Sequence, residues 1–132
     1  MITNNVWIKP SKSEREIFDS LRNFKSIDCI FYDAVKNNCT WMINKCLDEG
    51  ANIRFADDYA IVQSIYLGNI DVVKILMDWK DDVLKYYDDV IGLACFCDQI
   101  DIIKLLLTYD RVKESLDERD KEKLRNLDIS YE

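Results

Sequence analysis

Histidine is absent from the 132 residues, and the chain contains only one proline and three glycines. Without histidine the chain lacks the most common general base and the usual zinc ligand, which disfavours triad hydrolases and histidine-metal enzymes. Neither of the glycine-rich phosphate-binding patterns, GxGxxG and GxxxxGK[ST], occurs. We therefore expect a non-enzymatic protein with no catalytic residue, no metal and no cofactor.

Long apolar runs are also missing, since no stretch approaches the roughly 18 residues that a membrane-spanning helix needs. Residues 1–10 contain no basic stretch followed by an apolar run, so no signal peptide is expected. The net charge is −7, which disfavours both nucleic acid and an anionic membrane as partners, because binding to them depends on clustered Lys and Arg. Composition thus predicts a single ordered domain in the cytoplasm.

The cysteines are odd in number and have no CxxC spacing, so we expect no disulfide framework. Cys46 and Cys95 fall at core phases of the repeat described below, and both are expected to be inert. Cys29, Cys39 and Cys97 fall at polar or mixed phases and are candidates for reactive thiols if they are exposed.

An internal repeat of 30 residues dominates the sequence. Residues 68–77 and 98–107 are nearly the same segment, and residues 38–47 lie one period earlier. Residues 30–35, 60–65 and 90–95 align at the same offset and share a small side chain at one phase, at Ala34, Ser64 and Ala94. A fixed period of this length indicates structural units that stack on one another.

Each unit contains two short helical patterns. The second has a broad apolar face, typical of a helix packed on its neighbours, and Asp71 and Asp101 lie in its first turn, where negative charge suits the helix dipole. The first pattern is preceded by Asp58 or Asp88, which we predict to be N-caps. The small residue in the first pattern, at Ala34, Ser64 or Ala94, would let that helix approach a neighbouring helix closely.

The ends of such a stack need covers. The Ser13–Glu16 capping box opens an amphipathic segment whose apolar residues are expected to seal the first unit. Those residues are Ile17, Phe18, Leu21 and Phe24. Residues 111–132 are rich in charge and predict a polar capping helix followed by a frayed tail. The junctions 50–57, 80–87 and 110–117 are predicted to be turns between units.

The predicted fold class is all-α, a helix-turn-helix repeat solenoid of about three repeats with helical caps. The predicted divisions are an N-terminal capping helix over 11–27, repeats over 28–57, 58–87 and 88–117, and a C-terminal cap and tail over 118–132.

The units resemble ankyrin repeats over residues 28–117. Residues 47–52, Leu-Asp-Glu-Gly-Ala-Asn, resemble the family's leucine followed by Gly-Ala-Asp/Asn, and residues 68–77 resemble its Gly-His-x-x-Val-Val-x-x-Leu-Leu segment. The Thr-Pro-Leu-His signature is replaced in all three copies, and the unit is 30 rather than about 33 residues long. Tetratricopeptide repeats, the alternative, need 34 residues and a signature that this chain lacks.

The degenerate copies and the abundance of Asn, Asp, Lys, Ile and Tyr are similar to the ankyrin proteins of giant DNA viruses, although a poxvirus or an AT-rich protist would give a related composition. The resemblance implies an interaction module that binds an unknown protein partner, a host factor if the origin is viral. The alternative is a self-associating structural protein, a homo-oligomer that stacks through its exposed repeat ends.

The resemblance also implies where the partner binds, at the hairpin tips and the exposed side of the first helices. Aromatic residues and Arg are the side chains that most often anchor interfaces. The candidate partner-binding residues are Arg54, Phe55, Tyr59, Gln63, Tyr66, Trp79, Lys80, Lys85, Tyr86 and Tyr87. Trp79 and Tyr86 would alternatively pack under their turn. Trp41 occupies the phase of Asp71, and we expect the N-terminal segment to cover it.

Overall fold

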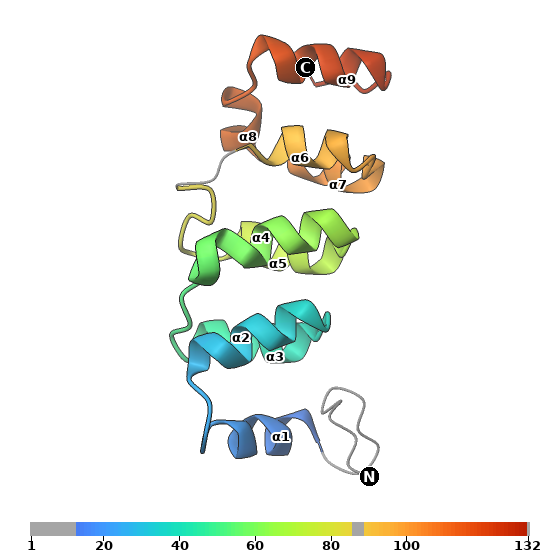
Figure 1. The fold of residues 1–132 in the computed structure, drawn as a ribbon. Coiled ribbons are helices and arrows are strands. Elements are labelled where there is room, and N and C mark those ends of the chain that lie inside the picture. The colour runs from blue at the N-terminus through green and yellow to red at the C-terminus, as the bar shows by residue number, and fades with distance from the viewer. Residues whose placement is uncertain (1–12, 86–88, 132) are drawn as a thin grey trace. The chain divides into compact units, whose positions relative to one another are not determined.

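The computed structural model describes residues 13–85 and 89–131, and within these residues all regular structure is helical (Figure 1). This confirms the all-α class. The chain divides into two compact units, Met1–Ala60 and Ile61–Glu132, which we call unit 1 and unit 2 and describe separately. The element α4 (Phe55–Leu67) starts in unit 1 and ends in unit 2, and its residues 56–58 have a backbone that is not helical.

Unit 1 begins with the helices α1 (Glu14–Leu21), α2 (Ile27–Lys36) and α3 (Thr40–Asp48), and α3 contacts both α1 and α2. The predicted capping box is confirmed, because the Glu16 amide donates to Ser13 Oγ at 3.2 Å and the Ser13 amide donates to Glu16 Oε1 at 3.0 Å. Phe18 of α1 meets the Trp41 ring edge-on, with ring centroids 6.4 Å apart. The N-terminal segment therefore covers part of Trp41, as expected, and leaves its side chain 36% exposed.

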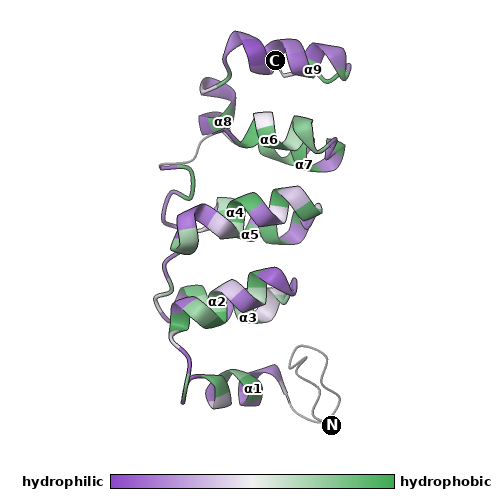
Figure 2. Cartoon of the chain, in the orientation of Figure 1, coloured by the Kyte–Doolittle hydropathy of each residue, from purple (hydrophilic) through white to green (hydrophobic). Residues whose placement is uncertain are grey.

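Unit 2 contains the helices α5 (Ile70–Asp78), α6 (Val90–Phe96), α7 (Ile100–Leu106), α8 (Asp110–Glu114) and α9 (Glu118–Asn126). α7 contacts α5 and α6, and α6 also contacts α9. Figure 2 shows that α6 and α7 are largely hydrophobic, whereas α9 is largely hydrophilic. The apolar interior of unit 2 is thus built by the end of α4, which buries Ile61 and Ile65, together with α5, α6 and α7, and α9 packs against α6.

The 30-residue period of the sequence recurs in the backbone. α3, α5 and α7 begin at residues 40, 70 and 100. Two residues before each start lies a residue with positive φ, namely Asn38, Gly68 and Asp98. The next amide donates to the carbonyl five residues back, at 2.9, 2.8 and 3.0 Å respectively, and the acceptors are Ala34, Ser64 and Ala94. These three small residues are fully buried, as their shared phase predicted.

The same positive-φ turn ends α9. Asp128 has a φ of 59°, and the Ile129 amide donates to the Leu124 carbonyl at 2.9 Å. Asp128 and Leu124 lie 30 residues after Asp98 and Ala94, so α9 ends in the geometry of a first helix of the repeat. The polar helix expected near the C-terminus is present, and the tail that was expected to fray is hydrogen-bonded as far as Ile129.

At the first repeat boundary, Asp58 directly precedes the regular helical part of α4, because residues 56–58 have left-handed φ values of 60°, 55° and 63°. The Asp58 carboxylate pairs with Arg54. One other expectation about the repeat boundaries is wrong. The junction 110–117 is not a plain turn, because α8 forms within it and buries Val112. The predicted cap Asp88 lies outside the described residues.

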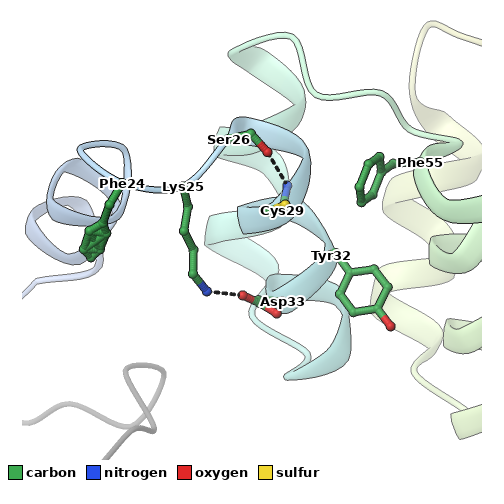
Figure 3. Close-up of a pocket in the computed structure, with 7 residues that line it drawn as sticks. All are labelled: Phe24, Lys25, Ser26, Cys29, Tyr32, Asp33 and Phe55. Atoms are coloured by element: carbon green, nitrogen blue, oxygen red, sulfur yellow. Dashed lines mark hydrogen bonds and ion pairs between the residues drawn. The ribbon is translucent and has the colours of Figure 1, made fainter.

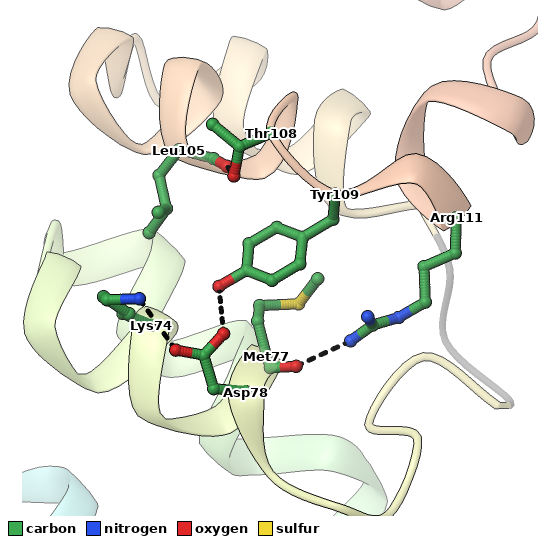
Figure 4. A network of polar contacts seen from close by, with 7 residues as sticks. All are labelled: Lys74, Met77, Asp78, Leu105, Thr108, Tyr109 and Arg111. Carbon is green, nitrogen blue, oxygen red and sulfur yellow. Dashed lines mark hydrogen bonds and ion pairs between the residues drawn. The ribbon is translucent and has the colours of Figure 1, made fainter.

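A polar network in unit 2 joins the end of α5 to the start of α8 (Figure 4). The Tyr109 hydroxyl donates to Asp78 Oδ1 at 2.6 Å, and Lys74 Nζ lies 2.7 Å from Asp78 Oδ2. Arg111 Nη2 donates at 2.8 Å to the Met77 carbonyl, which lies in the last turn of α5. Hydrogen bonds from Lys74 and Tyr109 lower the pKa of the Asp78 carboxyl.

We expect Tyr109 to make the stability of unit 2 sensitive to alkaline pH. Burial, followed by the hydrogen bond to Asp78, raises the pKa of Tyr109 to about 12, against an ordinary value of about 10. Because the folded-state pKa is raised, neutral Tyr109 stabilises the fold fully below about pH 10, and this contribution is lost as the pH rises to about 12. Tyr109→Phe should lower the urea midpoint at about pH 8, and the difference from wild type should shrink by about pH 12.

The matched control is Tyr66→Phe, which removes the hydroxyl of a side chain that is 58% exposed. Its urea midpoint should follow that of the wild type across the same pH range. A midpoint difference for Tyr109→Phe that stays constant from neutral to alkaline pH would contradict the role of this hydroxyl.

Candidate binding surface

A surface hollow of about 470 Å³ lies in unit 1, beside the outward face of α2 (Figure 3). Seven residues line it: Phe24, Lys25, Ser26, Cys29, Tyr32, Asp33 and Phe55. Figure 3 shows Phe24 on one side and Tyr32 and Phe55 on the other. The lining therefore combines aromatic side chains from three segments of unit 1 with a few polar groups.

The amphipathic character of α2 explains why its residues face the hollow. Cys29, Tyr32 and Asp33 follow the i, i+3, i+4 spacing of one helix face. Ile30 and Phe31 lie on the opposite face and are buried, with exposed fractions of 0% and 1%. Ser26 starts the helix, because its hydroxyl accepts the Cys29 amide at 3.2 Å.

Three aromatic rings form a cluster at one end of the hollow. Tyr32 stacks on Tyr59, with ring centroids 4.0 Å apart and an interplanar angle of 22°. Tyr32 also meets Phe55 edge-on, with centroids 6.4 Å apart and an angle of 89°. Both arrangements are favourable geometries for aromatic pairs. Burial and then the neighbouring Tyr32 raise the pKa of Tyr59 above its ordinary value. We call Tyr32, Phe55 and Tyr59 the aromatic cluster.

Polar contacts in the preceding loop hold Phe55 in place. The Asp28 carboxylate accepts the Asn52 amide at 2.8 Å, and the Asn52 side chain accepts the Arg54 amide at 3.0 Å. Arg54 Nε lies 2.9 Å from Asp58 Oδ1, and the Asp58 residue is only 8% exposed. Arg54, a predicted partner-binding residue, is thus engaged within its own loop, on either side of Phe55.

Polar groups bring charge to the same hollow. Lys25 Nζ lies 2.6 Å from Asp33 Oδ2, with side chains that are 42% and 30% exposed. An exposed pair of this kind contributes little to stability. Phe24 is 69% exposed. Aromatic rings next to a half-exposed ion pair can receive the apolar and cationic side chains of a protein ligand.

The structure brings together only some of the predicted binding residues. Phe55 and Tyr59 meet through Tyr32 in unit 1. The others that it describes lie in unit 2, apart from Arg54, and they are Gln63, Tyr66, Trp79, Lys80 and Lys85. Trp79 is half-buried, and Lys80 Nζ lies 5.7 Å from the centroid of its ring. Tyr86 and Tyr87 lie outside the described residues.

Of the residues that line the hollow, only Phe55 was a predicted partner-binding residue, and the aromatic residues Phe24 and Tyr32 were missed. Phe24 was expected in the apolar face that seals the first unit, but α1 ends at Leu21 and Phe24 is exposed. The signal was Ser26, because an N-cap so close leaves no room for the earlier helix to continue. Tyr32 was not among the candidates, although it is an aromatic residue where the next two repeats carry Val62 and Gly92.

The cysteines differ in accessibility. Cys46 is fully buried, and burial raises the pKa of its thiol to about 12, which agrees with an inert core residue. Cys95 was also expected in the core but is half-buried, because it lines a hollow between α6 and α9. Burial and then Glu14 raise the pKa of Cys39 to about 11. Cys29 is exposed and lines the unit 1 hollow.

The described part of the chain contains no group of three or more His, Cys, Asp or Glu side chains that could hold a metal ion. None of its helices has the length and apolar character needed to cross a membrane.

In comparisons with known proteins, no family model matches the chain, and neither a curated protein nor a solved structure matches it.

Proposed function

We propose that this chain is an ankyrin-type repeat protein that binds a partner protein and has no enzymatic activity. Three observations support the repeat architecture: the helix starts at residues 40, 70 and 100, the recurring positive-φ turn before each of them, and the buried small residue at a fixed phase. Repeats that share such geometry stack into a continuous core and leave their variable side chains for binding.

The observation that carries the binding proposal is the aromatic lining of the unit 1 hollow. The repeat does not require aromatic residues at these phases, because Tyr32 corresponds to Val62 and Phe55 corresponds to Lys85 one period later. Phe24 is exposed, and Tyr32 and Phe55 are half-buried. Accessible aromatic residues that the fold does not need are typical anchors of protein interfaces. We propose that a partner inserts apolar side chains between Phe24 and the aromatic cluster.

The proposal that the partner is a host protein rests on the resemblance alone. If the similarity to the ankyrin proteins of giant DNA viruses reflects common origin, the partner is a host protein and the complex forms in the host cytoplasm. Nucleic acid remains an unfavourable partner for a chain with a net charge of −7.

Affinity purification with matched variants tests this proposal. The hollow variant combines Phe24→Ser, Tyr32→Val and Phe55→Lys, of which the last two use residues that the repeat itself carries at those phases. The control is Lys36→Asn, an exposed residue outside the hollow, because Asn126 occupies the equivalent position three periods later. A partner should be enriched by the wild type and the control, and its recovery should fall at least about tenfold with the hollow variant.

Circular dichroism on the same samples establishes that the variants are folded. Equal recovery of every enriched protein by the wild type and a folded hollow variant would contradict the proposed surface. Light scattering tests the alternative function: a mass that rises with concentration would support self-association, and a monomer at high concentration would reject it.

A further inference from the structure

Unit 2 carries a second apolar surface that is exposed. This surface lies at the turns between α4 and α5 and between α6 and α7. Its members come from the end of α4, the start of α5 and the end of α6. They are Tyr66, Leu67, Ile70 and Phe96, with exposed fractions of 58%, 48%, 36% and 83%. We call these four residues the turn patch.

Contacts of Gln99 hold the two turns of the patch side by side. Gln99 Nε2 donates to the Tyr66 carbonyl at 3.3 Å. A Cβ atom built on Gly68 would lie 2.9 Å from Gln99 Oε1, so the Gln99 side chain rests directly against the Gly68 turn. Phe96 also borders a hollow of about 240 Å³ that Leu127 and Lys123 help to line. The apolar surface is therefore continuous across neighbouring turns and ends beside a hollow.

The repeat itself shows that folding does not require these apolar side chains. Lys36, Tyr66, Phe96 and Asn126 share one phase of the period, and all four are exposed. Leu67 similarly corresponds to Asn37. A phase that accepts Lys and Asn faces solvent in this architecture, so aromatic residues there call for an explanation other than core packing.

Three carboxylates lie close in sequence to members of the turn patch. Asp71 follows Ile70 in the first turn of α5, Asp98 lies in the turn after Phe96, and Asp101 lies in the first turn of α7. All three are exposed, and within the described residues none of them forms an ion pair. Residues 61–132 contain 16 acidic and 10 basic residues, which gives unit 2 a formal charge of −6 out of the total of −7.

We propose that the turn patch is a second docking surface, separate from the unit 1 hollow, and that it binds a basic amphipathic helix of a partner protein. The apolar face of such a helix covers Tyr66, Leu67, Ile70 and Phe96, and its Lys and Arg side chains reach the three carboxylates. An anionic membrane is repelled by these carboxylates, and a second copy would bring like charges into contact.

The probe for this surface is a fluorescein-labelled peptide of about 14 residues, composed of Leu and Lys with Leu at i, i+3, i+4 and i+7. Two comparison peptides keep its length: one scrambles the order and so loses the apolar face, and the other replaces every Lys with Glu. Binding to the full chain is measured by fluorescence anisotropy at low and physiological salt.

Two sets of substitutions separate apolar from charged contributions, and most use residues from the repeat itself. The patch variant is Tyr66→Lys, Leu67→Asn and Phe96→Asn. The charge variant is Asp71→Asn, Asp98→Asn and Asp101→Asn, and Asn38 already occupies the phase of Asp98 with the same positive φ. The control is Tyr32→Val with Phe55→Lys, which changes only the unit 1 surface.

We expect the Leu/Lys peptide to bind wild type and the control equally, and its Kd to rise at least about tenfold with the patch variant. The charge variant should weaken binding more strongly at low salt than at physiological salt, because salt screens exposed charges. The scrambled and Leu/Glu peptides should bind at least about tenfold more weakly than the Leu/Lys peptide.

Several results would overturn the proposal. These are absent binding, an unchanged Kd for the folded patch variant, or equally tight binding of the scrambled peptide. Two other results would also contradict it. Binding of wild type to vesicles of phosphatidylserine and phosphatidylcholine would assign the patch to a membrane surface. A mass that rises with concentration, and no longer does so in the patch variant, would assign it to self-association. If the patch variant does not fold, hydrogen exchange on wild type decides, with peptide-induced protection expected at residues 64–71 and 94–101 and its absence there contradicting the surface.

Discussion

Replacing Phe31 with alanine is expected to lower the free energy of unfolding by about 3–5 kcal/mol. Phe31 lies on the inward face of α2 and is 1% exposed. Removing its ring forfeits the transfer of that apolar surface from water and leaves a cavity that a packed interior closes only in part. Since small domains are stable by about 5–15 kcal/mol, this single change should remove a large part of the total.

The matched control for Phe31→Ala is Phe24→Ala, the same substitution at a side chain that is 69% exposed. Its cost should stay within about 0.5 kcal/mol, because little apolar surface is returned to water. Urea denaturation followed by circular dichroism measures both values. A similar loss for the two variants would show that α2 does not bury Phe31 as the structure describes.

Replacing Leu124 with alanine is expected to cost about 2–5 kcal/mol and to release α9 from α6. Leu124 is fully buried and is the one buried residue of α9, whose other residues are mostly charged. The Asp117–Asp120 capping box supports the start of the helix, but a helix of nine residues is marginal without packing. The contact of Leu124 with the rest of unit 2 therefore decides whether α9 forms.

Hydrogen exchange across residues 118–126, together with the urea midpoint, measures this effect. The control is Leu67→Ala, which truncates a leucine that is 48% exposed. We expect amides of α9 to exchange much faster in Leu124→Ala and at the wild-type rate in Leu67→Ala. Unchanged protection of α9 in Leu124→Ala would contradict its anchoring role.

The helices were the most predictable part of the fold, because their apolar spacing repeats. Val72, Val73, Leu76 and Met77 are buried on α5, and the residues 30 positions earlier and later are buried in the same pattern. The capping box at Ser13 was equally predictable, since it depends on residues three positions apart. Local spacing was sufficient for both features.

The connections were less predictable, because tertiary contacts decide them. Aspartate is a common N-cap residue, but the Asp58 carboxylate forms an ion pair with Arg54, and residues 56–58 have positive φ. The segment that forms α8 has the polarity of a turn, but it buries Val112 and is joined through Arg111 to the end of α5. Contacts with residues that are distant in the sequence, such as that of Arg111 with the end of α5, cannot be read from the spacing of neighbouring residues.

The residues of the candidate surfaces also fall into those that the sequence predicted and those that only the structure revealed. Phe55 and Tyr59 were predicted from where the ankyrin resemblance places hairpin tips and first helices. Tyr32 joins them because α2 and the start of α4 meet in unit 1. Phe96 was not identified, because at the end of an apolar helix it has the composition of a core residue. Its exposure of 83% became clear only from the structure.

The sequence by itself determined the helical class, the 30-residue period and the buried phases of each helix, because these depend on spacing along a regular backbone. Only the tertiary structure decided how the connections are held and which apolar side chains remain exposed. Both depend on contacts between residues far apart in the chain, such as Asp28 with Asn52 and Gln99 with Tyr66. No periodic pattern encodes those contacts, and they place the aromatic cluster and the turn patch at the surface.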